Sequence, residues 1–123
     1  MKRIYTYPLL LFTSLLLCII GLQPDLAAQP KREFRGTWIT TLSNLDWPSA
    51  KGLSSQKLQA ELSALLDSLQ AYGMNAVILQ IRAAGDALYP TNFAPWAASL
   101  SGTEGKPPAP LYAPLAYAIE ESH

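Results

Sequence analysis

The sequence predicts an α/β fold in which one β-α-β unit opens a larger domain. Residues 34–41 are rich in β-branched and aromatic side chains, residues 54–72 carry leucines at helical spacing, and residues 76–79 are an unbroken apolar run. A strand, an amphipathic helix and a buried strand in this order form a parallel unit with an expected right-handed crossover. Two parallel strands and two helices do not bury both faces of such a sheet, so residues 29–123 are predicted to be the amino-terminal part of the domain.

Residues 1–28 are predicted to be a cleaved signal peptide. Two basic residues precede an apolar stretch, and Ala27-Ala28 provides the small residues of a cleavage site. The apolar stretch is short for a membrane span of about 20 residues, and no stable span is expected after cleavage. The protein is therefore expected in the periplasm or outside the cell. Two alternatives stay open, an uncleaved anchor and a lipoprotein attached through Cys18, although Leu17 is not the small residue that lipidation favours.

The part after the predicted signal is nearly neutral and offers little to metals. Seven Lys and Arg stand against eight Asp and Glu in residues 29–123, which gives 7 − 8 = −1. Without a basic patch, neither nucleic acid nor an anionic membrane surface is expected as a partner. The single Cys lies in the predicted signal and the single His is His123, so neither a zinc site nor thiolate chemistry is expected. Residues 102–107 superficially resemble a phosphate-binding loop, but Pro107 stands where Ser or Thr is required, and no cofactor is expected.

Local composition predicts the first strand, a loop and a helix. The strand is expected over residues 34–41 with Trp38 in the core, and turn residues make residues 42–53 a loop. Ser54 or Ser55 is expected to cap the helix. Its buried stripe contains Leu58, Leu62, Leu65, Leu66 and Leu69, extended by Tyr72. Gly73 is expected to end the helix in the left-handed conformation.

The second strand is expected to begin at Met74 and to end at a polar site. Gln80, Arg82 and Asp86 follow its apolar run in quick succession. In parallel α/β folds, ligands bind at the carboxyl ends of strands. This segment is therefore the first candidate for a binding site.

The rest of the sequence predicts a long loop and a last helix. Residues 82–113 form a connection of a length that is usually functional within a compact domain. The helix is expected to begin at Pro114, because proline suits the first helical position, and to run through Glu121. No helix stop follows, which again indicates an amino-terminal fragment.

Seven sequence blocks stand in one order along residues 33–123. They are residues 33–38 (EFRGTW), 44–48 (NLDWP), 73–82 (GMNAVILQIR), 85–90 (GDALYP), 95–96 (PW), 100–103 (LSGT) and 114–121 (PLAYAIEE). Together they resemble glycosyl hydrolase-like family 10, and several blocks in a fixed order are more specific than any single motif. Ala113 departs from the family pattern, in which an Asp commonly precedes the proline and would cap the helix. Its absence costs about 1 kcal/mol of local stability.

The resemblance implies a (β/α)8 TIM barrel and a glycoside hydrolase that acts on a bacterial polysaccharide. Peptidoglycan glycan strands are a substrate class associated with some relatives. Such a barrel takes about 250 residues, so residues 29–123 would supply its first two β/α units. The acidic residues suspected of catalysis in the family follow later strands, beyond His123. No position here matches them, and no catalytic residue is assigned.

The predicted substrate-binding residues lie in the two loops after the strands. They are Asp46, Trp47, Arg82, Asp86, Tyr89 and Trp96. Asp86 either contacts sugar hydroxyls or shapes its loop, by pairing with Arg82 or capping a turn. Arg82 either binds a carboxylate or acetamido oxygen or joins a buried network. Gln80 either lines the pocket or satisfies the neighbouring strand end. The loop aromatics, Phe93 and Tyr112 included, either stack on sugar rings or pin the loop onto its core.

Two functions from different classes stay open. One is the amino-terminal part of an exported glycoside hydrolase, and the other is a glycan-binding protein on the same scaffold without hydrolysis. A pair of carboxyl groups about 5–10 Å apart across a cleft would favour the first. Expressed alone, the 123 residues are expected neither to fold cooperatively nor to hydrolyse glycans.

Overall fold

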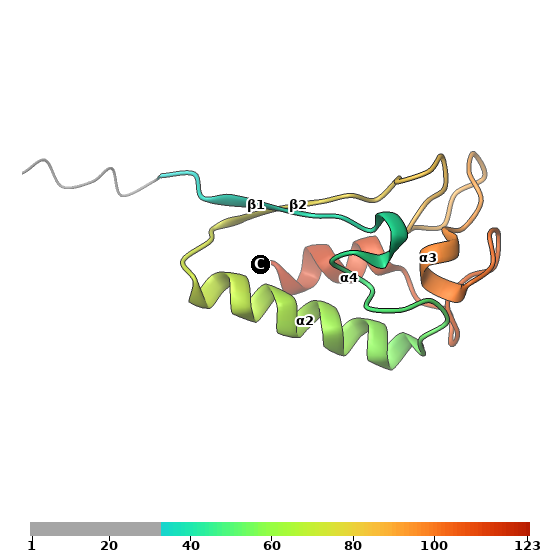
Figure 1. The fold of residues 1–123 in the computed structure, drawn as a ribbon, viewed down its shortest axis with the longest axis horizontal. Coiled ribbons are helices and arrows are strands. Elements are labelled where there is room, and N and C mark those ends of the chain that lie inside the picture. Colours follow the sequence, from blue (N-terminus) through green and yellow to red (C-terminus); the bar gives the residue numbers. More distant parts are fainter. Residues whose placement is uncertain (1–32) are drawn as a thin grey trace, which may run out of the picture. The chain divides into compact units, whose positions relative to one another are not determined.

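The computed structural model describes residues 33–123, and Figure 1 shows how their elements are arranged. In chain order these are strand β1 (Gly36–Ile39), the 3-10 turn η1 (Leu42–Asn44), helix α2 (Ser55–Ala71), strand β2 (Ala76–Leu79), helix α3 (Ala98–Ser101) and helix α4 (Pro114–Glu121). The predicted signal peptide, its cleavage site and Cys18 lie outside the described residues. Within residues 33–123, no helix has the length and apolar character needed to cross a membrane.

β1 and β2 lie side by side as a parallel pair, which confirms the predicted β-α-β unit (Figure 1). The register pairs Gly36 with Ala76 and Ile39 with Leu79. Each strand has 4 residues and is shorter than the segment predicted for it. One backbone hydrogen bond continues the ladder at its carboxyl end, from Gln80 N to the Ile39 oxygen at 3.0 Å. The pair therefore ends where the polar residues begin.

Helix α2 has the start and stop that the sequence predicts. The Ser54 hydroxyl oxygen accepts the Lys57 N–H at 3.3 Å, and Gly73 follows the helix with a φ of +81°. The leucine stripe faces the core, with Leu58 and Leu62 fully buried. The predicted extension of the stripe by Tyr72 is wrong. This residue is 82% exposed, because it lies past the last helical residue and no longer follows the helical spacing.

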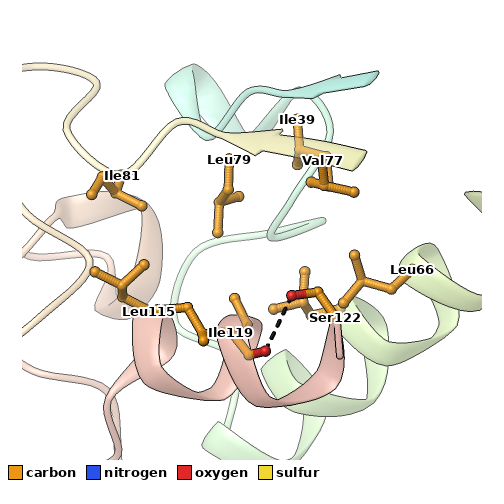
Figure 2. Close-up of a pocket in the computed structure, with 10 residues that line it drawn as sticks. Ile39, Leu66, Val77, Leu79, Ile81, Leu115, Ile119 and Ser122 are labelled. Carbon is orange, nitrogen blue, oxygen red and sulfur yellow. Dashed lines mark hydrogen bonds between the residues drawn. The ribbon is translucent and has the colours of Figure 1, made fainter. Parts of the chain in front are cut away.

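The two faces of the strand pair have different surroundings. One face lies toward α2 and α4 and lines an apolar groove of about 220 Å³ (Figure 2). The groove is lined by residues that include Ile39, Leu66, Val77, Leu79 and Ile119. Strand alternation places Trp38 and Ile78 on the opposite face, where they are 58% and 45% exposed. The prediction of Trp38 in the core is therefore wrong for residues 33–123, whose helices pack on the other face only.

The long connection from β2 to α4 is held by its own backbone hydrogen bonds and buried side chains. It includes helix α3, which was not predicted. The Ala87 N–H donates to the Pro95 oxygen and the Ala97 N–H to the Ala87 oxygen, both at 2.9 Å. Ala87, Leu88, Ala97 and Leu100 are buried. These contacts explain how a connection with little regular structure keeps one shape.

Helix α4 begins at Pro114, as predicted, and packs on α2. Ala113 precedes it in an extended conformation and supplies no side-chain cap, as its departure from the family pattern indicated. Between the helices, the Ser63 hydroxyl lies 2.7 Å from the Tyr117 phenol oxygen and donates to the Glu121 carboxylate at 2.6 Å. Polar contacts thus join the two helices beside the groove.

Candidate functional site

Polar side chains gather where β1 and β2 end. The strand-end cluster consists of Thr40, Thr41, Asp46 and Gln80. Thr40 and Gln80 directly follow the paired residues Ile39 and Leu79, so they are neighbours at the carboxyl end of the strand pair. Ligands of parallel α/β folds bind at this edge. The cluster is therefore the best candidate site in the described part of the chain.

Gln80 is held by the end of β1 through both its backbone and its side chain. Its backbone oxygen accepts the Thr41 hydroxyl at 2.8 Å, in addition to the ladder bond from its N–H. Its side-chain oxygen, Oε1, accepts the Thr40 hydroxyl at 2.5 Å and the Thr41 N–H at 3.3 Å. The Thr40 hydroxyl oxygen in turn accepts the Leu42 N–H at 3.2 Å. The carboxamide therefore has a fixed position.

Asp46 connects the loop after β1 to the strand end. Its Oδ2 accepts the Thr40 N–H at 2.8 Å, and its own N–H donates to the Thr40 oxygen at 3.4 Å. The residue is exposed. A carboxylate has about four lone-pair sites, so one backbone contact leaves acceptor capacity for a ligand. Asp46 thus shapes the loop and remains accessible.

Arg82 and Asp86 form a separate turn just beyond β2. The Asp86 Oδ1 accepts the Ala84 N–H at 3.1 Å, and the Arg82 Nε donates to the backbone oxygen of Asp86 at 3.4 Å. Asp86 therefore caps a turn, which is one of the structural roles predicted for it. Arg82 is exposed and not part of a buried network, and its terminal nitrogens make no hydrogen bond within residues 33–123. No hydrogen bond in this part of the chain joins the turn to the strand-end cluster.

Trp47 is packed as a core residue. It is 1% exposed, and its indole Nε1–H donates to the Leu58 backbone oxygen at 3.0 Å. It belongs to the same buried cluster as Ile39, Leu62 and Leu88. Trp47 therefore lies under the first loop. Its indole has a structural role there and no exposed face on which a sugar could stack.

The aromatic side chains of the long loop divide into two groups. Trp96 and Tyr112 pack against the core and pin the loop, while Tyr89 is half-buried and Phe93 is 95% exposed. The Tyr112 phenol oxygen is buried without a hydrogen-bond partner among the described residues. Burial, reinforced by the Tyr117 phenol, raises the pKa of Tyr112 above its usual value. Tyr89 and Phe93 therefore keep the surface on which a sugar ring can stack.

A comparison with known protein families shows the family of the chain. The sequence model of the family described as Glycosyl hydrolase-like 10 matches residues 33–123. The chain belongs to this family. The resemblance predicted from the seven sequence blocks is confirmed.

Two curated glycosyl hydrolases are similar to this glycosyl hydrolase-like 10 chain. Over 96 residues it is 50% identical to Glycosyl hydrolase YngK of Bacillus subtilis (strain 168), a match that covers 78% of this chain and 18% of the relative. Over 107 residues it is 32% identical to Glycosyl hydrolase DigH of Escherichia coli (strain K12), which covers 81% of this chain and 24% of the relative. The chain therefore spans less than a quarter of the length of these relatives.

The predicted site residues did not include two members of the strand-end cluster, Thr40 and Thr41. Their position in the sequence, directly after the first strand, could have identified them. They follow the first strand as Gln80 follows the second, and the carboxyl ends of parallel strands meet at one edge. Of the two roles left open for Gln80, contact with the neighbouring strand end is confirmed by its hydrogen bonds to both threonines. In residues 33–123, no group of three or more His, Cys, Asp or Glu could hold a metal ion.

Proposed function

We propose that this chain is the amino-terminal part of an exported glycosidase that acts on a bacterial polysaccharide, with peptidoglycan glycan strands as its substrate. In this proposal, residues 29–123 follow a cleaved signal peptide and supply the first two β/α units of a (β/α)8 barrel. They bind and shape the sugar chain, and carboxyl groups after later strands break the bond. Family membership and the names of the two relatives support the glycosidase class.

The observation that carries the proposal is the strand-end cluster. Asp46 and Gln80 are held by hydrogen bonds of 2.8 Å and 2.5 Å to Thr40, at the edge where parallel α/β folds bind ligands. Side chains that are already fixed lose little conformational freedom when a polar ligand binds. Arg82 adds an exposed fork of donors suited to an acetamido or carboxylate oxygen, and Tyr89 adds an aromatic surface.

The exposed face with Trp38 and Ile78 supports the barrel. Parallel sheets are normally buried on both faces. In a (β/α)8 barrel, inward side chains from all eight strands fill the interior. The remaining strands of such a barrel would cover these two side chains, which are 58% and 45% exposed in residues 33–123.

A second function, glycan binding without hydrolysis, is compatible with the same geometry. Asp46 and Asp86 each accept a backbone N–H, at 2.8 Å and 3.1 Å, as loop-shaping carboxylates do. Glycoside hydrolysis commonly requires two carboxyl groups that flank the scissile bond. A barrel without that pair would bind glycans and leave them intact.

Purified peptidoglycan sacculi test both functions in one experiment. The protein is produced from its own gene and incubated with sacculi, and sedimentation measures binding while new reducing ends measure hydrolysis. Binding with new reducing ends is the expected result. Binding without them supports the second function, and absence of binding contradicts both. Arg82→Ala is expected to weaken binding, and Lys106→Ala is the matched control, because it removes an exposed cation of the same loop outside the site.

A further inference from the structure

We propose that the Gln80 carboxamide is a fixed hydrogen-bond donor that selects a neutral acceptor oxygen of the glycan, a sugar hydroxyl or an acetamido carbonyl. This inference rests on the proposed function and adds a specificity-determining residue to it. The sequence left open whether Gln80 lines the pocket or satisfies the neighbouring strand end, and did not place it among the six predicted substrate-binding residues. Its role follows from which end of its amide faces β1.

The contacts with Thr40 and Thr41, just after β1, fix the orientation of the amide. The Thr41 N–H can only donate, so the Gln80 atom 3.3 Å from it must be the oxygen. The Thr40 hydroxyl accepts the Leu42 N–H at 3.2 Å, which leaves its own hydrogen for the same Gln80 oxygen, 2.5 Å away. Two independent donors therefore hold Oε1 against β1. The amide nitrogen, Nε2, is the end that faces away.

Within residues 33–123, this nitrogen remains available to a ligand. Nε2 of Gln80 makes no hydrogen bond within residues 33–123. If this nitrogen were buried, it would be a buried polar atom without a partner, and among these residues the Tyr112 phenol oxygen is the one such side-chain atom. Solvent therefore reaches Nε2. Ile39 and Leu79 face the apolar groove, so strand alternation places Thr40 and Gln80 on the opposite face, at the carboxyl end of the pair. Two unused N–H groups thus lie at the edge where ligands bind.

The chemistry of a held amide defines its ligand. Nε2 carries two N–H donors and no acceptor, and the group is neutral. It suits an uncharged oxygen, whereas the charged guanidinium of Arg82 also binds a carboxylate. Because Oε1 is already occupied by two donors, the amide does not turn over to present its oxygen instead. A site built around such a donor rejects a ligand that lacks the matching acceptor, because the N–H group then loses its partner.

Two substitutions separate the donor role from a purely structural one. Gln80→Glu keeps oxygen atoms toward Thr40 and Thr41 but replaces the donor with an acceptor. Gln80→Met removes donor and acceptor without adding a charge. Each variant of the protein is tested for binding to purified sacculi by sedimentation, and its thermal midpoint is followed by circular dichroism. We expect both to weaken binding about tenfold, the effect of one hydrogen bond, and Gln80→Glu to keep the midpoint of the unaltered protein.

The outcomes distinguish this proposal from the proposed function. If the unaltered protein and Gln80→Glu bind sacculi equally well, Gln80 has only its structural role and the inference is wrong. Loss of binding in Gln80→Glu but not in Gln80→Met would indicate charge repulsion and would equally overturn the donor role. If the unaltered protein does not bind sacculi, the proposed function fails and the inference fails with it.

Discussion

Replacement of Trp47 by Phe tests whether this side chain supports the fold or contacts the sugar. The substitution removes the indole N–H that donates to the Leu58 oxygen at 3.0 Å and shortens a ring that is 1% exposed. The lost hydrogen bond costs about 1 kcal/mol. The smaller ring leaves a void in a core that relaxes only in part, which adds about 1–2 kcal/mol. The expected loss is therefore about 2–3 kcal/mol.

Urea unfolding followed by circular dichroism measures this loss. With a slope of about 2 kcal/mol per molar urea, the midpoint should fall by about 1 M. Phe93→Leu is the matched control, because Phe93 is 95% exposed and its replacement should change stability by less than about 0.5 kcal/mol. Sacculus binding of the Trp47 variant, measured where it is folded, should equal that of the unaltered protein. An unchanged midpoint together with weaker binding would refute the core assignment.

Three further predictions follow from other contacts. Residues 29–123 expressed alone should show no cooperative thermal transition and no glycosidase activity, because Trp38 and Ile78 remain 58% and 45% exposed in this part of the chain. Ala113→Asp should raise the free energy of unfolding of the protein by about 1 kcal/mol, since Ala113 is extended and caps nothing; the thermal midpoint reports it. Glu61→Ala should lower the free energy of unfolding at pH 7 by about 1–2 kcal/mol, because the carboxylate accepts the Ser49 N–H at 3.1 Å and the Ser49 hydroxyl at 2.7 Å.

The Glu61 prediction has a defined pH dependence. Partial burial raises the pKa of the Glu61 carboxyl. The hydrogen bonds from Ser49 and the charge of Lys57 outweigh this effect and leave the pKa below its ordinary value of 4.5. The folded state therefore binds this proton less readily than the unfolded state. The stabilisation is complete above about pH 4.5 and is lost as the pH falls through the lower folded pKa. The difference between Glu61→Ala and the unaltered protein should shrink in acid.

Other results would contradict these expectations. A sharp two-state melt of residues 29–123 with measurable turnover would show that the fragment is sufficient. An Ala113→Asp variant with a lower midpoint than its parent would mean that the carboxylate does not reach the first free N–H groups of α4. A Glu61→Ala deficit that is the same at pH 3 and pH 7 would exclude an ionised carboxylate as its cause.

The β-α-β unit was predictable because its signals are local. Ser54, the leucine stripe and Gly73 each act within a few residues, and each has the predicted role. Trp38 is exposed in residues 33–123, contrary to the prediction, because periodicity and composition report how apolar a strand is, not which of its faces finds a partner within this part of the chain. Trp47 was harder for a different reason. It lies in a polar loop, and only the tertiary contact with Leu58 on α2 shows that the indole turns inward.

The region of the site could be predicted from the sequence, but the arrangement of its side chains could not. Gln80, Arg82 and Asp86 follow the second strand, and the rule that ligands bind at carboxyl ends of strands was enough to select this region. The orientation of the Gln80 amide depends on Thr40, which lies 40 residues away in the sequence. A pattern read along the chain does not report such a contact.

The register of the strand pair also limits how this segment can fold. Each residue of β1 lies 40 positions before its partner in β2, so the pair cannot form until β2 has left the ribosome. Helix α2 consists of local contacts and can form much earlier than the long-range parallel ladder. The entropy of closing the connection must be lost before the ladder gains its hydrogen bonds. Until β2 is available, β1 has no partner strand, and an unpaired strand is a site at which chains aggregate.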